Sequence, residues 1–275
     1  MHYDKQKRDR FDKCNICGNY AKLTWDHVPP KICFNTEKTE YTQMFGDIEK
    51  ERSNQRHNIT QNGIKYRSIC ETCNNCLLGS NYDKELEKLI KELTLKLMLP
   101  SVIKISINVN KLARSVAGHI LAAKNNYDAD NLVDIGLREF VLDSSSLPPR
   151  DTRLLFRLYP YDGIFIIRDV VVRNLYANHY PLPNGMLSCL SFYPIAFILC
   201  QSDFDCGLLD LFPLCSNDPE RMTDVQIDLL SYRFPDSVKI RDPEWPCNIT
   251  DNGEGVSMVL AGNSIKDSVV TQKRL

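Results

Sequence analysis

Two pairs of cysteines in this chain have the spacing of metal-binding knuckles. One pair is Cys14 and Cys17, the other is Cys70 and Cys73, and both have the form Cys-x-x-Cys. Four thiolates bind Zn²⁺ tetrahedrally and close its coordination shell, so that no position remains for water or a substrate. We therefore predict a structural zinc ion between two points that are far apart in the sequence. In a unit with a small core, such an ion can decide whether the unit folds.

The chain contains 11 cysteines, and the other seven lack a paired metal-binding spacing. We interpret them as small apolar residues that are buried in the core. They are Cys33, Cys76, Cys189, Cys200, Cys206, Cys215 and Cys247. The charged N-terminal residues lack the apolar segment of a secretory signal, and no apolar run approaches the length that crosses a membrane. We therefore expect a cytoplasmic protein without membrane association, whose thiols are kept reduced.

Three side chains close to the cysteine pairs could carry chemistry. Asp26 and His27 end a strand that we expect over residues 21–28, before two prolines that cannot continue the ladder. Asn74 directly follows Cys73, where we expect a helix to begin. If zinc joins the cysteine pairs, the end of the strand and the start of the helix come together. A carboxylate, an imidazole and an amide carbonyl then meet at one site.

These three groups suit the hydrolysis of phosphodiester bonds. The oxygens of Asp26 and of the Asn74 side chain are hard ligands, which Mg²⁺ and Mn²⁺ prefer. A neutral His27 can take the proton of an attacking water, since its ordinary pKa lies near neutral pH. Basic side chains nearby could hold the phosphate backbone of a nucleic acid. The candidates for this contact are Lys31, Arg52, Arg56, Lys65 and Arg67.

Charge is distributed unevenly along the chain. The formal net charge is −1, but residues 1–80 contain 13 Lys and Arg against 10 Asp and Glu, a balance of +3. The remaining residues contain 21 against 25, a balance of −4. The positive part is the part that contains the cysteine pairs. This balance gives modest support to a polyanionic partner, and we expect nucleic acid, DNA in particular.

Taken together and in order, these motifs resemble those of a known family, the HNH endonucleases with a ββα-metal core. In this chain the motifs are Cys14-x-x-Cys17, Asp26-His27-Val28-Pro29-Pro30 and Cys70-x-x-Cys73-Asn74. The resemblance covers roughly residues 14–80 and implies a metal-dependent nuclease. It implies that His27 is the general base and that Asp26 and Asn74 hold one divalent ion, Mg²⁺ or Mn²⁺. It also implies that cleavage leaves a 5′-phosphate.

The chain departs from the family pattern at two places. A middle asparagine of the family often orients the general base, and here Asn54, Asn58 and Asn62 are available. Asn62 lies nearest to the second strand, which we expect over residues 64–70, so we select it for this role. The family also often has a basic residue or a histidine three or four positions after Asn74. This chain has two leucines there, so its metal ligands and backbone contacts can differ in detail.

We expect an α+β protein with three parts. Residues 1–80 form the zinc-stapled ββα-metal HNH domain. Residues 81–148 form a helical connector, in which apolar residues recur at helical spacing over 82–98 and 109–124. Residues 149–275 form a mixed, mostly antiparallel β-rich domain.

The β-rich domain is predicted from four apolar runs. They cover residues 153–160, 163–173, 190–199 and 256–260. Between the first two runs, Asp162-Gly163 predicts a hairpin turn. In the N-terminal part, residues 35–62 have few apolar anchors, and we interpret them as a long polar loop.

Several of these assignments have a plainer alternative. Asn74 would also suit the N-cap of a helix, where asparagine is preferred. His119 flanks the apolar face of the second predicted helix, and we interpret it as a packed histidine. For the whole chain, the alternative to a nuclease is a non-catalytic, zinc-stapled module that binds nucleic acid.

The C-terminal part has no motif of its own that indicates chemistry. We expect it to regulate or target the nuclease, or to bind a partner protein or a second copy of the chain. Bacterial anti-phage defence effectors join HNH nucleases to sensing domains in the same order. That role is therefore an analogy at the level of domain organisation.

Overall fold

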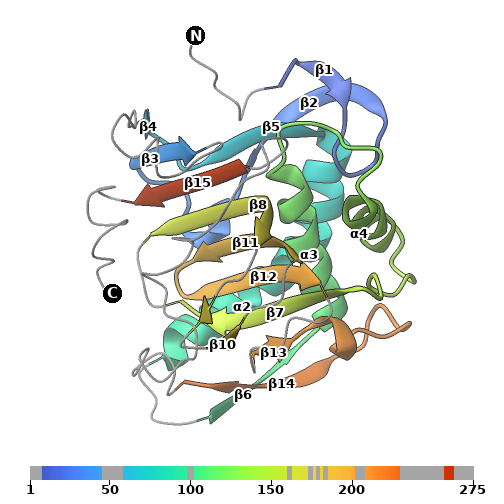
Figure 1. Ribbon diagram of the computed structural model, residues 1–275. Helices are drawn as coiled ribbons and strands as arrows, with labels where there is room; N and C mark the ends of the chain where they lie inside the picture. The colour runs from blue at the N-terminus through green and yellow to red at the C-terminus, as the bar shows by residue number, and fades with distance from the viewer. Residues whose placement is uncertain are drawn as a thin grey trace.

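The computed structural model of the chain has the expected α+β class (Figure 1). It begins with short strands that carry the four paired cysteines, continues with three α-helices, and ends with strands of a large antiparallel sheet. The residues that the structure describes are 8–44, 58–97, 102–159, 163–172, 176–177, 180–181, 185–201, 208–229 and 257–262. No helix in these ranges is long and apolar enough to cross a lipid bilayer.

A small antiparallel sheet near the N-terminus adjoins both cysteine pairs. Its strands, in the order β1-β2-β5, are β1 (Phe11–Lys13), β2 (Tyr20–His27) and β5 (Lys65–Cys70). The strands predicted over residues 21–28 and 64–70 are therefore confirmed. The turn between β1 and β2 has a φ of 71° at Gly18, a conformation in which a side chain would be strained. Antiparallel pairing sets His27 opposite Lys65, at the end of β2.

Eight antiparallel strands form the large sheet, in the order β13-β7-β12-β11-β8-β15-β3-β4 (Figure 1). From one edge to the other they are β13 (Leu209–Asp210), β7 (Thr152–Leu158), β12 (Ile195–Gln201), β11 (Gly185–Phe192), β8 (Ile164–Val172), β15 (Ser257–Gly262), β3 (Thr39–Met44) and β4 (Asn58–Thr60). The runs over 153–160, 163–173 and 256–260 correspond to β7, β8 and β15. Two of the eight strands, β3 and β4, come from the N-terminal part of the chain.

The interpretation of residues 35–62 as a loop is wrong for β3 and β4. Strand β15, from the C-terminal part, pairs with β3 on one side and with β8 on the other. An alternation of apolar residues is the usual signal of a strand, and this segment has few apolar residues. The apolar pattern therefore did not predict β3 and β4. The N-terminal part therefore shares a sheet with the C-terminal part. The domain boundary at residue 80 stays a prediction.

One prediction for the large sheet is wrong, and one predicted apolar run contains two strands. A hairpin at Asp162-Gly163 would pair β7 with β8, but β7 pairs with β12 and β8 pairs with β11, so two strands separate them. Asp162 itself lies outside the described residues. The single run over residues 190–199 is a hairpin of β11 and β12, with Tyr193 and Pro194 in the turn. Apolar patterning identifies these segments, but their pairing depends on contacts between distant parts of the chain.

Three α-helices lie on one face of the large sheet (Figure 1). They are α2 (Asp83–Lys96), α3 (Val109–Ala122) and α4 (Leu132–Leu142). The first two confirm the helices predicted over 82–98 and 109–124, and α4 is an additional helix. Asn131 caps α4, because its side chain accepts hydrogen bonds of 3.0 and 3.1 Å from two backbone amides of the first turn. A π-helical segment, η2 (Thr72–Tyr82), leads directly into α2.

Short elements complete the fold. Two ribbons pair β6 (Val102–Ile107) with β14 (Thr223–Asp228) and β9 (Tyr176–Ala177) with β10 (Tyr180–Pro181). Two 3-10 turns are η1 (Lys31–Cys33) and η3 (Phe212–Leu214). The ribbon β6-β14 anchors the start of α3, because Asn108 caps that helix and also donates a 2.7 Å hydrogen bond to the carbonyl of Pro219.

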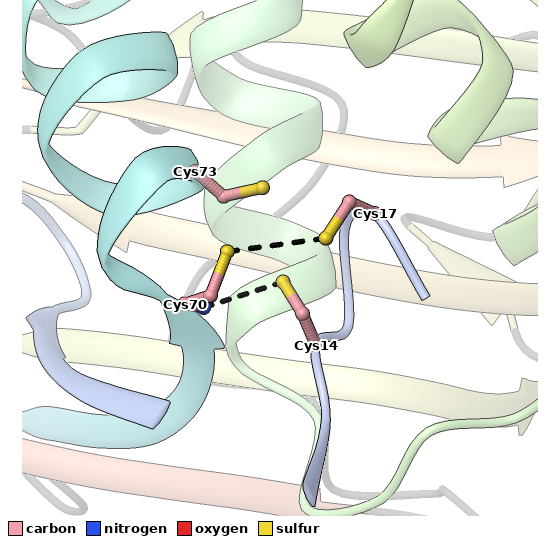
Figure 2. A group of neighbouring side chains, drawn as sticks. All are labelled: Cys14, Cys17, Cys70 and Cys73. Carbon is pink, nitrogen blue, oxygen red and sulfur yellow. Dashed lines mark hydrogen bonds between the residues drawn. The ribbon is translucent and has the colours of Figure 1, made fainter. Parts of the chain in front are cut away.

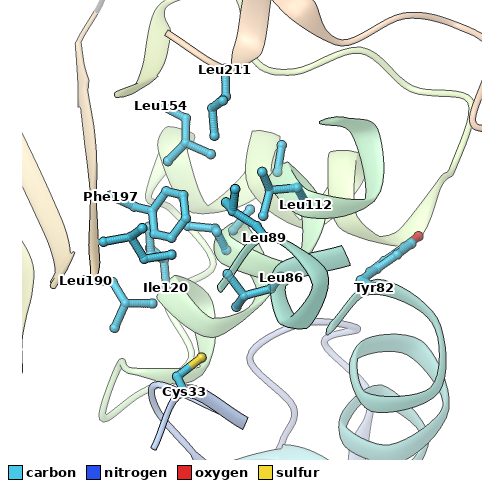
Figure 3. Packing of buried hydrophobic residues seen from close by; sticks show 14 of the residues in the cluster. Cys33, Tyr82, Leu86, Leu89, Leu112, Ile120, Leu154, Leu190, Phe197 and Leu211 are labelled. Atoms are coloured by element: carbon cyan, nitrogen blue, oxygen red, sulfur yellow. The ribbon is translucent and has the colours of Figure 1, made fainter. Parts of the chain in front are cut away.

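One continuous apolar core lies between the helices and the large sheet (Figure 3). Leu86 of α2 and Leu112 and Ile120 of α3 lie on the helix faces that meet Phe197 of β12. These are the apolar stripes from which the two helices were predicted. The same cluster of buried residues includes Ile16, between the first two cysteines. The small N-terminal sheet and the large sheet therefore share a core.

A buried cluster of charges joins the helices to the large sheet. Lys124, just after α3, forms an ion pair with Asp134 of α4 at 2.8 Å, and Arg168 of β8 donates to the same carboxylate at 2.7 Å. Arg138 of α4 donates to the backbone carbonyl of Asn15 at 2.9 Å. Loss of one partner alone would leave an unpaired buried charge, which is strongly unfavourable. The network thus holds α3 and α4 against both the sheet and the first cysteine pair.

Candidate functional site

The four paired cysteines form one cluster (Figure 2). Cys14 and Cys17 lie between β1 and β2, Cys70 ends β5, and Cys73 lies in the first turn of η2. Their four sulfurs lie within 4.8 Å of one another, and the Sγ atoms of Cys17 and Cys70 are 3.9 Å apart. Tetrahedral Zn–S bonds of about 2.3 Å set neighbouring sulfurs about 3.8 Å apart. The cluster therefore fits a single zinc ion.

The electrostatics of the cluster also favour a cation. Burial and, after it, the neighbouring charge of Cys14 raise the pKa of the Cys17 thiol to about 11. A bound metal ion offsets this repulsion and lets all four sulfurs ligate as thiolates. The backbone N–H of Cys70 donates to Sγ of Cys14 at 3.3 Å. Within the described part of the chain, no other set of three or more His, Cys, Asp and Glu side chains brings its ligand atoms so close together.

The remaining cysteines of the described ranges differ in exposure. Three are buried as predicted, namely Cys33, Cys189 and Cys200. Cys76 is exposed and Cys215 is half-buried, so the interpretation as a buried apolar residue is wrong for Cys76. It lies on an exposed part of η2, a position that the spacing of cysteines does not reveal. Cys206 and Cys247 lie outside the described residues.

An open cavity of about 510 Å³ lies where β2 ends and η2 begins. Six residues of the predicted site line it, namely Asp26, His27, Lys31, Asn62, Lys65 and Asn74. Trp25, Asp83 and Lys84 also line the cavity, and the sequence motifs had assigned no role to them. The cysteine cluster joins β5 and η2 to the turn before β2. The strand end and the helical segment therefore meet at this cavity, as the joining of the cysteine pairs would require.

His27 lies at the last position of β2 and faces Asn62. Its Nε2 atom is 3.2 Å from the backbone oxygen of Asn62 and 3.4 Å from the side-chain oxygen. Both partners only accept, so these contacts assign the ring hydrogen to Nε2 and leave the lone pair on Nδ1. Burial lowers the pKa of His27, and the charges of Lys65 and Lys31 act in the same direction. An uncharged imidazole of this kind can accept a proton.

Asn74 lies inside the helical segment η2, whose N-cap is Glu71, so the alternative of an N-cap role is wrong. Its side-chain nitrogen donates to the hydroxyl of Thr24 and to the backbone oxygen of Trp25, both at 3.1 Å. Both hydrogen bonds of the amide nitrogen are therefore made to β2. The carbonyl oxygen of the same amide is the atom that suits a hard metal ion. The contact also fixes η2 against the strand that carries Asp26.

Asp26 is buried and has a partner that the motifs did not indicate. Nδ1 of His119 lies 3.1 Å from Oδ2 of Asp26, and Nε2 of the same ring lies 3.0 Å from Oδ1 of Asp83. Burial alone would lower the pKa of His119, but the charges of Asp83 and Asp26 outweigh it and raise the pKa to about 10. His119 is buried, as predicted, and its ring bridges two acidic side chains. Helical spacing indicates its burial and cannot reveal its partners.

The predicted nucleic-acid contacts are only partly gathered at the cavity. Lys31 and Lys65 line it, and Lys84 adds a third positive charge. The guanidinium of Arg67 instead lies 5.4 Å from the ring centroid of Trp25 and donates to the backbone carbonyl of Arg8 at 2.8 Å. The predicted residues Arg52 and Arg56 lie outside the described part of the chain.

Comparison of the chain with protein-family models, with curated proteins and with solved structures finds no match. The arrangement of the cluster and the cavity is therefore the basis for a functional proposal, together with the motifs that form them.

Proposed function

We propose that the chain is a metal-dependent endonuclease of the HNH type, which hydrolyses phosphodiester bonds in DNA. One observation carries the proposal. Asp26, His27 and Asn74, which come from two separate elements, line the same open cavity, whose lining also includes three lysines. A carboxylate, an uncharged imidazole and an amide oxygen are the groups that metal-assisted hydrolysis needs. A protein that only bound nucleic acid would need none of the three.

The residues of the site divide into a metal ligand set and a proton acceptor. The Asp26 carboxylate and the Asn74 carbonyl are hard oxygen donors that fit Mg²⁺ or Mn²⁺. When bound, such an ion supplies charge stabilisation for the leaving oxygen. The structural zinc belongs to the four cysteines, whose closed shell excludes it from the reaction.

The reaction that follows is a balanced hydrolysis. An attacking water gives one proton to Nδ1 of His27 and forms a bond to phosphorus. The bond between phosphorus and the 3′ oxygen breaks, and that oxygen takes a proton from a second water, which leaves a 5′-phosphate and a 3′ hydroxyl. The hydroxide formed from the second water then takes the proton from His27. Asn62 holds the opposite ring nitrogen and keeps the imidazole in the required tautomer. Lys31 and Lys65 hold the phosphate backbone.

A cleavage assay on several nucleic acids tests the proposal. Purified full-length protein is incubated with supercoiled plasmid, single-stranded DNA and RNA, with Mg²⁺, Mn²⁺, Ca²⁺ or EDTA. We expect cleavage of DNA with Mg²⁺ or Mn²⁺, none with EDTA, and products with a 5′-phosphate. Asp26→Asn should remove the activity, because it replaces a charged metal ligand by a neutral one.

The matched control is Asp224→Asn, which removes an exposed carboxylate on β14, in a different sheet from the cavity. It should cleave at the wild-type rate. Absence of cleavage with every metal, together with DNA binding that survives EDTA, would reject the enzyme. That result would favour the alternative, a non-catalytic zinc-stapled binding module.

Trp25 offers an aromatic surface for nucleobases next to the proposed metal site. It lines the cavity and remains 44% exposed. The guanidinium carbon of Arg67 lies over its ring, 5.4 Å from the centroid. Stacking of a base on an aromatic side chain contributes about 1–3 kcal/mol, which is roughly 5- to 150-fold in affinity. We expect Trp25→Ala to weaken binding of a fluorescent single-stranded oligonucleotide by this factor, measured by anisotropy in EDTA.

Tyr20 provides the control for that experiment. It lies on the same strand and is even more exposed, at 73%, but it does not line the cavity. Tyr20→Ala should therefore bind the oligonucleotide like the wild type. Equal losses in both variants would assign the effect to general surface contacts, and no loss in either would exclude stacking at Trp25.

We also propose that the part of the chain that forms the large sheet regulates or targets the nuclease. Strand β4 forms one edge of this sheet, and Asn62, the partner of His27, follows it by two residues. A partner bound at this edge would therefore lie close to the general base. Expression toxicity that requires both His27 and a phage or nucleotide trigger would support this role. Expression toxicity that requires His27 but needs no trigger would count against it.

A further inference from the structure

A single buried histidine lies between two acidic residues that line the cavity. His119 is only 1% exposed, and its two ring nitrogens lie 3.1 Å from Oδ2 of Asp26 and 3.0 Å from Oδ1 of Asp83. Ionised carboxylates only accept hydrogen bonds, so both nitrogens donate and the ring carries a positive charge. Asp26 belongs to β2 and Asp83 begins α2. One side chain of α3 thus joins β2 to α2.

Two further residues of α3 support the contact between His119 and the two acidic side chains. Ser115 lies one turn before His119, and its hydroxyl donates to Oδ1 of Asp83 at 2.6 Å. Gly118 packs against Leu78 of η2, and a Cβ at position 118 would collide with that leucine. The absence of a side chain at this glycine therefore lets α3 and η2 approach closely. The close approach brings His119 up to the two carboxylates.

The position of His119 relative to the cavity indicates that it acts on the site and is not only a buried ion pair. Both of its partners line the cavity, whereas His119 itself does not. It contacts Asp26 from the protein side and holds the Oδ2 atom. The orientation of this carboxylate is therefore set by α3 as well as by β2. In metal sites, hydrogen bonds of this kind to ligating groups orient the ligand and affect activity.

We infer that His119 is a positioning residue of the nuclease site, which orients the Asp26 carboxylate toward the divalent ion and uses Asp83 as its second anchor. The inference rests on the proposed function, in which Asp26 is a metal ligand. It also enlarges the site beyond residues 14–80. Helix α3 packs on η2, on α4 and on β11 of the large sheet. The motif segment alone is then an incomplete nuclease.

Two variants of the full chain separate positioning from folding. His119→Phe removes both donors and keeps a ring of similar size, whereas His119→Gln keeps an amide that can donate to a carboxylate. We expect His119→Phe to lower kcat for oligonucleotide cleavage about 10- to 100-fold at saturating Mg²⁺, with KM within about twofold of the wild type. His119→Gln should recover part of kcat. Rates are divided by the folded fraction, which a urea titration gives for each variant.

The same data can overturn the inference. If kcat falls only in proportion to the folded fraction, His119 is a structural residue and does not orient Asp26. If KM for the oligonucleotide rises while kcat is unchanged, the residue acts on nucleic-acid binding instead. A partial return of kcat in His119→Gln, at unchanged KM, supports the positioning role.

A spectroscopic measurement tests the contact without cleavage. In protein labelled with ¹⁵N in its histidines, the ring N–H signals of His119, assigned by their loss in His119→Gln, should shift when Mg²⁺ is added. Asp26→Asn should abolish this shift. No shift in a wild type that cleaves DNA would reject the inference and keep the proposed function. A shift without any cleavage would keep the contact and reject the nuclease, and the absence of both would reject both.

Discussion

A Cys14→Ser variant is expected to lose the zinc ion of the wild-type chain and to unfold at a much lower urea concentration. The wild type should contain one zinc ion per chain by elemental analysis. Binding of a structural zinc ion contributes about 10–16 kcal/mol in small zinc-binding peptides. The entire stability of a domain is about 5–15 kcal/mol. Loss of one of four thiolate ligands therefore removes a contribution as large as the stability itself.

The loss of stability should extend beyond the small sheet, because Asn15, which lies between the first two cysteines, is hydrogen-bonded to the end of α3. The side chain of Asn15, next to Cys14, donates to the backbone carbonyls of Leu121 and Lys124 at 3.0 and 2.8 Å. These hydrogen bonds cap the C-terminal end of α3 with the turn that contains Cys14 and Cys17. When the cluster opens, this end of α3 loses its partners. We therefore expect a single unfolding transition at lower urea rather than a separate loss of the N-terminal strands.

The control for this prediction is Cys76→Ser. Cys76 lies only three residues after Cys73, but it is exposed and does not belong to the cluster. It should retain one zinc ion and change the free energy of unfolding by no more than about 0.5 kcal/mol. A Cys14→Ser protein with full zinc content and unchanged stability would show that the cluster does not bind zinc.

Local patterns predicted much of this arrangement. The Cys-x-x-Cys spacing placed two ligand pairs in two turns, and the four sulfurs do lie within 4.8 Å of one another. Apolar residues at helical spacing identified α2 and α3, because the apolar positions of both helices pack into the core. The two prolines after His27 marked the end of β2. Each of these features depends on residues that are close in sequence.

The rest depends on contacts between distant residues, which carry no local pattern. Strand β3 has its place because β15, more than 200 residues later, pairs with it. Asp83 belongs to none of the sequence motifs, and its contact with His119 exists only after α2 and α3 have packed. Arg67 lies on the expected strand, yet its guanidinium contacts Trp25 rather than the cavity. Sequence motifs thus identified Asp26, His27, Asn74 and the His27 partner Asn62, but not the contact of His119 with Asp26.

Replacement of His27 by alanine is expected to lower the rate of metal-dependent cleavage by about 10²- to 10⁴-fold, the usual contribution of a general base. The attacking water then loses the imidazole that takes its proton. KM for DNA should change little, because Lys31 and Lys65 still line the cavity. Zinc content and the urea midpoint should also remain near wild-type values, since His27 is outside the cluster. Initial rates on plasmid DNA with Mg²⁺ give the measurement.

Chemical rescue distinguishes a missing base from a disturbed site. The cavity is open and has a volume of about 510 Å³, so free imidazole can enter the space that alanine leaves beside Asn62. Added imidazole should therefore raise the rate of His27→Ala and leave the wild type unchanged. Asn62→Ala should lose less activity than His27→Ala, because it removes the side-chain contact at 3.4 Å and keeps the backbone contact at 3.2 Å. Full activity of His27→Ala without imidazole would exclude His27 as the general base and, with it, the proposed mechanism.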